Sequence, residues 1–455
     1  MKVLKFGGTS VGSAQRMKDV AKLITDGEQK IVVLSAMSGT TNTLVEISDY
    51  LYKKNPEGAN EVVNKLEAKY KQHIDELFST EEYKQKTLEF VKSVFDYIRS
   101  FTKDIFTLFE EKVILAQGEI ISTNMVTNYL CEQGVKAVLI PALEFMRTDK
   151  NSEPDLNYIR EKLALQLEAN PGQEIYITQG FICRNAYGEI DNLQRGGSDY
   201  TASLIGAAVN ASEIQIWTDI DGMHDNDPRV VDKTSPVRQL HFEEAAELAY
   251  FGAKILHPTC VQPAKYANIP VRLLNTMEPS APGTLISNET EKGKIKAVAA
   301  KDNITAIKIK SSRMLLAHGF LRKVFEIFES YQTPIDMVCT SEVGVSMSID
   351  NTKHLNEIVN DLKKYGTVTV DHDMCIVCVV GDLEWENIGF EAKAIQAMRN
   401  IPVRMISFGG SNYNISFLIR ESDKKTALQS LSRSEEHTSE LQSLEDLVCR
   451  LLLEK

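Results

Sequence analysis

The chain has 455 residues, of which 43% are hydrophobic, so it is long enough for about three domains with sizeable cores. It carries 51 basic and 63 acidic residues, a formal net charge of -12, and it has no basic stripe of the kind that nucleic-acid binding needs. No apolar run approaches the ~18 residues of a membrane span or the length of a signal peptide. We therefore expect a cytoplasmic protein that acts on small molecules, with no nucleic acid and no membrane among its partners.

The seven cysteines are scattered along the chain and do not follow the spacing of a disulfide framework. The one close pair, Cys375 and Cys378, lies in an alternating apolar run that predicts a strand. Residues three apart on a strand point to opposite faces. We therefore expect buried thiols here rather than a metal or redox site.

Residues 1 to about 300 alternate strand-like and helix-like runs, the pattern of an α/β fold with a mainly parallel sheet. A helix is expected over 14–24, directly after the first strand and its glycines. The candidate strands are LKF, KIVVLSA, KAVLIPA, EIYITQGF, IQIWTD and VRLLN. Between the second and third strands, residues from about 50 to 112 are charged and carry apolar side chains at helical spacing. This stretch predicts an inserted helical subdomain.

From about residue 294 the pattern changes to two rounds of strand, helix, strand, strand, helix, which is typical of ferredoxin-like βαββαβ repeats. The first round closes with the strand TVTVDHD, whereas the second has no closing strand. An additional strand-like run, IKAVAAK at 295–301, precedes the first round. We therefore predict one domain over 1–293, a first repeat over 303–373, and a second repeat made of 294–302 and 374–432.

Residues 433–455 fit neither repeat. They begin with the Ser/Glu-rich run SRSEEHTSELQS and end in LEDLVCRLLLEK. A short helix, a disordered end and a non-native addition all remain open for this tail.

The motif KFGGTS places Lys5 at a strand tip beside Gly7 and Gly8. Glycines let the backbone approach an anion closely, the following helix directs its N-terminus toward it, and a lysine adds a positive charge. The motif is not the GxxxxGK[ST] loop of P-loop enzymes, and a tight turn without function remains open.

Two later junctions between a strand and a helix repeat this arrangement. In VVLSAMSGTTNTL, mostly small residues from Ser35 to Gly39 precede Thr40 and Thr41, whose hydroxyls either cap the helix or bind a ligand at the carboxyl end of the sheet. In LQRGGSDYTAS, Arg195 precedes Gly196–Asp199, where Ser198 or Asp199 could cap a helix. An arginine facing a glycine-lined corner suits bidentate recognition of a carboxylate or phosphate, so we favour a functional role for this motif.

The loop in IWTDIDGMHDNDPRVV crowds acidic side chains together with Arg229. Turn chemistry explains several of these acids, the spacing is not that of an EF-hand, and contacts to a nucleotide and its magnesium fit better. Lys254 in FGAKILHP is either one more cation for the site or a solvated lysine. Glu119 in LAQGEIIS is expected at the start of a helix, where a capping role is the alternative. No histidine has a nucleophile or metal partner at diagnostic spacing.

In this order, KFGGTS, SAMSGTTN, QGE, TQGF, RGGSDY, WTDIDG…DPR and FGAKILHP resemble the kinase domain of aspartokinase, a member of the amino-acid kinase superfamily. The resemblance covers residues 1–432, and the two repeats are similar to the paired ACT domains that regulate this family. It implies an α/β amino-acid-kinase fold, a mainly parallel sheet sandwiched by helices, followed by two ferredoxin-like βαββαβ ACT domains.

The resemblance implies transfer of the γ-phosphoryl group of MgATP to the side-chain carboxylate of L-aspartate, giving 4-phospho-L-aspartate. In this family the reaction opens lysine, threonine and methionine biosynthesis. A carboxylate is already ionised at neutral pH, so catalysis reduces to alignment and charge neutralisation. Lys5, with the backbone of Gly7 and Gly8, would stabilise the transferring group. Asp199 matches the active-site aspartate that organises the cations.

The resemblance also assigns the residues around the two substrates. Arg195 would pair with the α-carboxylate of aspartate and Glu119 with its ammonium, while Thr41 and Ser198 add hydrogen bonds and Phe181 shapes the wall. The positions around ATP are Lys5, Gly7, Gly8, Ser35, Thr218, Asp219, His224, Arg229 and Lys254. His224 stands where the family commonly has tyrosine. The implied cofactors are ATP and magnesium, with the magnesium carried by ATP rather than by a metal motif.

The first repeat carries SSRMLLAHGFLRKVF and TPIDMVCTSEVGVS, which resemble the lysine-inhibited members of the family. Asp336 would be the partner of an effector ammonium, and Ala317 replaces a serine found in some relatives. Met314, Phe320 and Leu321 have an alternative role as core residues. The implied effector positions are Met314, Phe320, Leu321, Pro334, Ile335, Asp336, Thr340 and Glu342. Lysine is the first candidate effector and threonine the second.

Two alternatives stay open. One is an amino-acid kinase that acts on glutamate-type substrates, against which the paired ACT repeats and RGGSDY argue. The other is a non-catalytic amino-acid sensor with a kinase-like fold, against which the presence of Lys5, Arg195 and Asp199 argues. A fused dehydrogenase is not expected, because nothing after the repeats could house a dinucleotide-binding domain. Edge strands of ACT domains commonly pair between chains, so we expect a homodimer or homotetramer.

Overall fold

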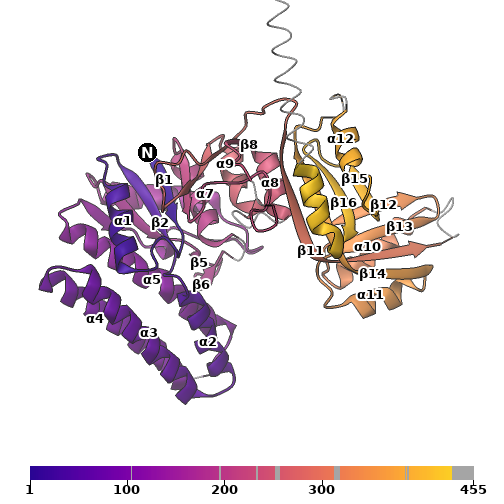
Figure 1. Cartoon of the computed structure of the whole chain (residues 1–455). Helices are drawn as coiled ribbons and strands as arrows, with labels where there is room; N and C mark the ends of the chain where they lie inside the picture. The colour runs from indigo at the N-terminus through magenta and orange to yellow at the C-terminus, as the bar shows by residue number, and fades with distance from the viewer. Residues whose placement is uncertain are drawn as a thin grey trace, which may run out of the picture. The chain divides into compact units, whose positions relative to one another are not determined.

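The computed structural model describes residues 1–103, 105–193, 196–231, 234–251, 257–311, 318–384, 386 and 389–432. Its chain divides into two compact units (Figure 1). The first contains Met1–Met223, Arg238–Phe242 and Ile255–Glu289. The second contains His224–Val237, Glu243–Lys254 and the chain from Thr290 onward. No helix among the described residues combines the length and the apolar character needed to cross a membrane.

The first unit is built on an eight-stranded sheet in the order β3-β4-β2-β1-β7-β9-β10-β8. All of its pairings are parallel except the one between β9 and β10. Its strands are β1 (Lys2–Phe6), β2 (Lys30–Leu34), β3 (Ala137–Leu139), β4 (Ile175–Gln179), β7 (Ile214–Thr218), β8 (Gln239–His241), β9 (Val271–Asn275) and β10 (Thr284–Ser287), and β5 (Ile182–Arg184) and β6 (Ile190–Asn192) form a separate hairpin. All six strands expected in this part of the chain are present.

The central strands β1, β2 and β4 are buried along almost their whole length, as expected for a parallel sheet covered on both faces. The helices are α1 (Ala14–Ile24), α2 (Thr40–Tyr52), α3 (Pro56–Leu77), α4 (Glu81–Ser100), α5 (Leu108–Glu132), α6 (Leu156–Ala169), α7 (Gly197–Val209) and α9 (Gln262–Tyr266), with short 3-10 turns at Phe101–Lys103, Ala142–Glu144 and Pro258–Val261. The inserted helical segment is present as α3 and α4, which pack with α2 and α5 (Figure 1). One apolar core joins these helices to the sheet.

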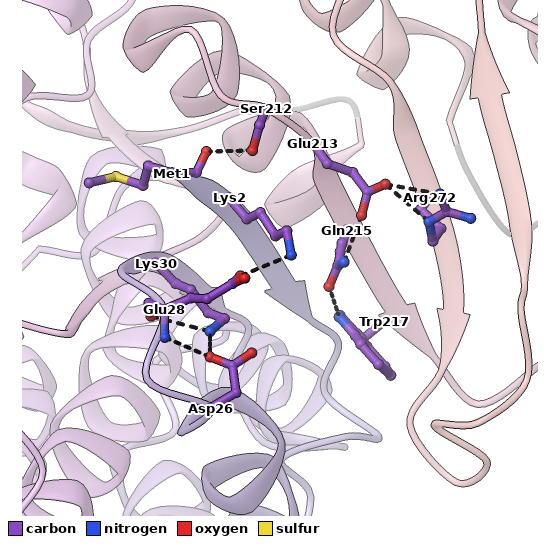
Figure 2. Close-up of polar contacts among 10 residues, drawn as sticks. All are labelled: Met1, Lys2, Asp26, Glu28, Lys30, Ser212, Glu213, Gln215, Trp217 and Arg272. Atoms are coloured by element: carbon purple, nitrogen blue, oxygen red, sulfur yellow. Dashed lines mark hydrogen bonds and ion pairs between the residues drawn. The ribbon is translucent and has the colours of Figure 1, made fainter.

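The amino end of this sheet is lined by pairs of charged side chains (Figure 2). Lys2 Nζ lies 2.9 Å from Glu28, Lys30 pairs with Asp26, and Arg272 pairs with Glu213 at 3.1 Å. In a parallel sheet, ligands bind at the opposite, carboxyl end of the strands. The pairs in Figure 2 therefore lie away from the loops that follow β1 and β2.

The second unit is built on a six-stranded antiparallel sheet in the order β12-β13-β11-β14-β16-β15. Its strands are β11 (Ile295–Lys310), β12 (Met337–Ser341), β13 (Gly344–Ile349), β14 (Thr367–Gly381), β15 (Met405–Phe408) and β16 (Asn414–Arg420), and its helices are α8 (Phe242–Tyr250, from its second residue on), α10 (Phe320–Ser330), α11 (Leu355–Leu362), α12 (Phe390–Ala397), a 3-10 turn at Glu421–Asp423 and helical residues 424–432.

Two pairs of strands that look separate in the sequence are continuous here. IKAVAAK and the strand after it form β11, and TVTVDHD runs on into CIVCVVGD as β14. Residues 295–301 of β11 pair with 376–381, and residues 306–310 pair with 367–371, with register shifts around Ile304. The two halves of this long ribbon contribute to two separate apolar cores. Cys375 and Cys378 are buried and free.

Candidate active site

Lys5 and Asp199 form an ion pair at the carboxyl end of the sheet. Lys5 lies on β1 and Asp199 in the first turn of α7, and Lys5 Nζ is 2.7 Å from Asp199 Oδ1. The side chains are only 11% and 16% exposed, so their attraction is weakly screened by water. A Cβ atom on Gly7 would lie 3.5 Å from Lys5 Nζ, which places this ammonium beside the glycine turn.

Gly8 lets the turns after β1 and β2 touch. A Cβ atom at Gly8 would lie 2.8 Å from the carbonyl oxygen of Ala36, a separation that real side chains do not adopt. The amide of Ser38 donates to the carbonyl of Gly8 at 3.1 Å, which ties the two turns together. The amide of Gly7 donates to the carbonyl of Trp217 at 3.4 Å. Two motifs about 30 residues apart thus form one surface.

A cavity of about 320 Å³ opens at this surface, a size suited to a small molecule. Its lining comes from the turns after β1 and β2, the start of α2, the middle of α5, the turn after β4 and the start of α7. The lining residues are Gly8, Ser35, Ala36, Met37, Ser38, Gly39, Thr41, Asn42, Glu119, Phe181, Gly197 and Ser198. Four of the five residues predicted to bind the acceptor are among them, and the fifth, Arg195, lies outside the described residues.

Glu119 is the buried charge of this cavity, and it lies in the middle of α5 rather than at a helix start, so the expected position was wrong. The helix begins earlier, at Leu108, where Thr107 and Glu110 form a capping box. Glu119 is 4% exposed, its Oε1 accepts from the amide of Ala36 at 3.2 Å, and among the described residues its buried Oε2 has no hydrogen-bond partner. Burial raises the pKa of Glu119 to about 7.

Ser198 and Phe181 line the cavity where the turn after β4 packs closely against the start of α7. A Cβ atom at Gly180 would lie 2.3 Å from Ser198 Oγ, so the turn after β4 must carry glycine there. Ser198 Oγ accepts a hydrogen bond from Ser35 Oγ at 2.9 Å. Phe181 adopts φ 67°, a left-handed conformation that is strained for an aromatic residue, and its amide donates to Thr201 Oγ1 at 2.9 Å.

The helix caps expected from the sequence are not formed by side chains. Gly39 is the N-cap of α2 and Gly196 is the N-cap of α7, both in the left-handed region and without a side-chain cap bond. Ser198 and Asp199 lie in the first turn of α7 instead of capping it. Their side chains are thus available to the cavity and to Lys5.

The residues predicted around ATP are distributed over both units. Thr218, at the end of β7, and Asp219 lie in the first unit, and His224 and Arg229 lie in the second. His224 Nδ1 is 3.0 Å from Thr234 Oγ1, and Arg229 pairs with Asp227 at 2.8 Å. Lys254 lies outside the described residues. The described part of the chain has no group of three or more His, Cys, Asp or Glu side chains placed to hold a metal ion.

The predicted effector residues lie around α10 and β12 of the second unit. Phe320 packs into the apolar core, which agrees with its alternative role, whereas Leu321 is 37% exposed. Pro334, Thr340 and Glu342 are exposed and Ile335 is half-buried. Met314 and Ala317 lie outside the described residues.

Asp336 is the buried member of this effector set, with a side chain only 1% exposed. Its Oδ1 accepts from Lys301 Nζ at 2.8 Å and from the hydroxyl of Tyr250 at 2.6 Å. Lys301 and Tyr250 did not stand out in the sequence, because each lies far along the chain from Asp336 and neither belongs to a motif.

Two protein families match parts of this chain. The amino acid kinase family matches residues 1–275, and an ACT domain family matches residues 377–434. "Aspartokinase 1, chloroplastic" of Arabidopsis thaliana is 34% identical over 97% of this chain and 81% of its own length. "Lysine-sensitive aspartokinase 3" of Escherichia coli (strain K12) is 32% identical over 94% of this chain and 98% of its own length.

Solved structures also resemble this chain over 95% of its length. Escherichia coli aspartokinase III in complex with aspartate and ADP has a TM-score of 0.82 at 31% identity, covering 95% of this chain and 99% of that one. Clostridium acetobutylicum aspartate kinase has a TM-score of 0.83 at 26% identity, covering 95% of this chain and 100% of that one. This chain therefore belongs to the aspartokinase family, whose members are ATP-dependent kinases that phosphorylate aspartate.

Proposed function

We propose that the cavity beside Lys5 binds L-aspartate and presents its side-chain carboxylate to the γ-phosphoryl group of ATP, giving 4-phospho-L-aspartate. The observation that carries this assignment is the buried, half-paired carboxylate of Glu119, which lines the same cavity as the glycine turn beside Lys5. A buried carboxylate with a free oxygen suits a ligand ammonium. The acceptor carboxylate needs no base, so positioning and charge neutralisation suffice.

On the acceptor side, Glu119 pairs with the ammonium of aspartate and Arg195 with its α-carboxylate. Thr41 and Ser198 donate or accept hydrogen bonds, and Phe181 forms a wall. All four described residues of this set line the cavity, which supports the assignment. The strained backbone of Phe181 supports it further, because such strain concentrates at functional sites.

On the nucleotide side, Lys5 and the amides of the glycine turn stabilise the charge of the transferring phosphoryl group. Asp199 holds Lys5 in place through the 2.7 Å ion pair and organises the cations. Magnesium, carried in by ATP, would neutralise phosphate charge. The remaining nucleotide contacts are assigned to Ser35, Thr218, Asp219, His224, Arg229 and Lys254.

A coupled assay of ADP release tests the acceptor. Aspartate is expected to support turnover at least about 100-fold faster than glutamate, because an added methylene displaces the carboxylate from the reacting position. Comparable rates with both acids would favour the glutamate-type kinase. No turnover with either acid would favour the non-catalytic sensor.

We further propose that residues 303–373 form one ACT domain and residues 294–302 with 374–432 the other, and that they bind an inhibitory amino acid. Lysine leads as effector, since a lysine-sensitive relative aligns over 94% of this chain, and threonine is second. Titration of lysine and of threonine into the assay tests which of them is the effector. Inhibition by threonine but not by lysine would make threonine the first candidate.

The ACT domains also suit self-association into a homodimer or homotetramer. The strands β12 and β15 contact each other within the chain, with Cys339 Sγ 3.2 Å from the carbonyl oxygen of Ile406. They still carry apolar side chains in solvent that a second chain could cover, with Val338 38%, Ile406 40% and Phe408 42% exposed. Light scattering coupled to gel filtration is expected to give a mass of two or four chains, and a monomer at micromolar concentration would contradict this.

A further inference from the structure

The helical insertion contacts the loop that lines the cavity through one buried tyrosine. Tyr70, on α3, is 1% exposed, and its hydroxyl lies 2.9 Å from Thr40 Oγ1. Thr40 is also 1% exposed and is the first residue of α2, directly before the cavity residue Thr41. The ring of Tyr70 packs against Phe95 on α4, with 5.9 Å between ring centroids.

Two further contacts hold the same loop. Lys69 Nζ, also on α3, donates to the carbonyl of Ser38 at 3.3 Å. A Cβ atom on Gly118 of α5 would lie 2.8 Å from the Cβ of Ala36 and 3.2 Å from Thr40 Cγ2. The loop 35–41 is therefore pressed between α3 and α5, and Tyr70 supplies its buried polar contact with α3.

We propose that Tyr70 is a positioning residue for the acceptor site. Its hydroxyl fixes Thr40, and Thr40 in turn fixes the loop 35–41 that forms one side of the cavity. The inference rests on the proposed function, because it names what the insertion does for the aspartate site. A buried hydroxyl pair has a defined geometry and excludes water, so it holds a loop more firmly than exposed contacts do. The insertion then contributes to acceptor binding and not only to the core.

The test is Tyr70→Phe, which keeps the ring and removes the hydroxyl. We expect the KM for aspartate to rise about fivefold, the effect of one lost hydrogen bond, with kcat and the KM for ATP changed less than about twofold. Tyr129→Phe, which alters another tyrosine of the same core outside the cavity lining, is the matched control and should leave both KM values unchanged.

A second variant separates the loss of positioning from a loss of stability. In the double variant Tyr70→Phe with Thr40→Val, both polar partners are gone, so melting temperature should recover while the KM for aspartate stays raised. A wild-type KM for aspartate in Tyr70→Phe, with wild-type turnover intact, overturns the positioning role. A wild-type protein without aspartate turnover would instead refute the proposed function.

A second, independent inference comes from Asp336, which holds an ammonium supplied by the chain itself. Lys301 Nζ lies 2.8 Å from Asp336 Oδ1, 2.9 Å from Asp350 Oδ2 and 4.3 Å from the centroid of the Tyr250 ring. Burial lowers the pKa of Lys301, but its bonds to Asp336 and Asp350 outweigh this and raise the pKa above the usual value. Lys301 is therefore a cation throughout the physiological range.

We infer that Lys301 is a tethered competitor of the effector: an amino acid whose ammonium binds Asp336 must first displace the ammonium of Lys301. This inference rests on the proposed effector role of Asp336. The second oxygen of Asp336, Oδ2, is buried and without a hydrogen-bond partner among the described residues, so it is closed to a ligand from solvent, and an effector ammonium reaches this carboxylate only by taking the place of Lys301. Tyr250, whose hydroxyl shares Asp336 Oδ1, ends α8, so displacement of Lys301 would also change the surroundings of that helix end.

The variant Lys301→Met tests whether Lys301 competes with the effector for Asp336. The concentration of lysine that gives half-maximal inhibition should fall about tenfold, the worth of one charge-assisted hydrogen bond, and the Kd for lysine by calorimetry should fall in parallel. Lys301→Arg keeps the charge and should stay close to wild type. Lys296→Met, on the same strand but paired with Glu291, is the control for loss of a buried lysine.

An unchanged or raised half-inhibitory concentration in Lys301→Met overturns the inference. If that variant does not fold, Tyr250→Phe replaces it and should shift inhibition in the same direction by a smaller factor, since it removes the other partner of the same oxygen. Absence of inhibition of the wild-type protein by lysine and by threonine would refute the effector proposal itself.

Discussion

Lys5→Ala is expected to lower kcat by about 100- to 1,000-fold, the effect of removing one preorganised charge from the transferring group. The ammonium of Lys5 lies beside the glycine turn and is held by Asp199, so no other described side chain replaces it at that place. Binding of aspartate, which we propose to depend on Glu119 and Ser198, should persist. Steady-state kinetics with calorimetry of aspartate binding measures both quantities.

Lys2→Ala is the matched control for this variant. Lys2 lies on the same strand, β1, at the opposite end of the sheet, and its exposed pair with Glu28 contributes little (Figure 2). It should keep wild-type kcat. If Lys5→Ala also keeps wild-type kcat while its melting temperature is unchanged, Lys5 does not act on the phosphoryl group.

Glu119→Gln is expected to raise the KM for aspartate about 100-fold with a smaller effect on kcat, because a buried ammonium loses its counter-charge. The amide keeps the size of the side chain and its acceptor for Ala36, so folding should be retained. A KM within threefold of wild type would show that the ammonium of aspartate binds elsewhere.

The raised pKa of Glu119 predicts that kcat/KM for aspartate depends on pH. Burial raises the pKa of Glu119 to about 7, so below pH 7 the free enzyme carries mostly a neutral carboxyl that cannot pair with an ammonium. In the wild type, kcat/KM for aspartate should fall up to tenfold per pH unit below about 7, and aspartate binding should release a proton there. In Glu119→Gln both effects should vanish.

Protonation of Glu119 has opposite effects on aspartate binding and on the stability of the ligand-free protein. The pKa of Glu119 is higher in the folded protein than its ordinary 4.5, so the folded state holds the proton more tightly. This group therefore stabilises the ligand-free protein at low pH, and the contribution is lost as the pH rises toward 7. Melting temperatures of the wild type and Glu119→Gln should be similar near pH 5 and separate as the pH rises toward 8, with the wild type falling below the non-titrating variant.

The fold class and the family were predictable because their signals are local. The strands β1, β2 and β4 are short apolar runs next to glycine-containing turns, and the motifs lie at strand ends, where such sheets bind ligands. The amino-acid-kinase fold, the ACT repeats and aspartokinase activity predicted from these motifs are confirmed by the relatives. The individual roles of the site residues stay predictions.

The features that could not be predicted depend on contacts between distant residues. IKAVAAK and TVTVDHD were each expected to end before the next strand begins, yet β11 and β14 continue without a break through a register shift, with Asn303 and Asp373 in left-handed conformations. Glu119 was assigned to a helix start, because the capping box at Thr107 lies in a charged stretch that masked the true beginning. Tyr70 and Lys301 act through partners 30 or more residues away.

Trapping the acyl phosphate with hydroxylamine tests the central claim most directly. Incubation of the wild-type protein with ATP, magnesium and aspartate should give the hydroxamate of the side-chain carboxyl group, identified by mass spectrometry, in an amount equal to the ADP released. The product should be absent without aspartate, and in Lys5→Ala its rate of formation should fall by the same factor as kcat. ADP release without hydroxamate, or hydroxamate from glutamate at the same rate, would contradict the assignment of this cavity to aspartate.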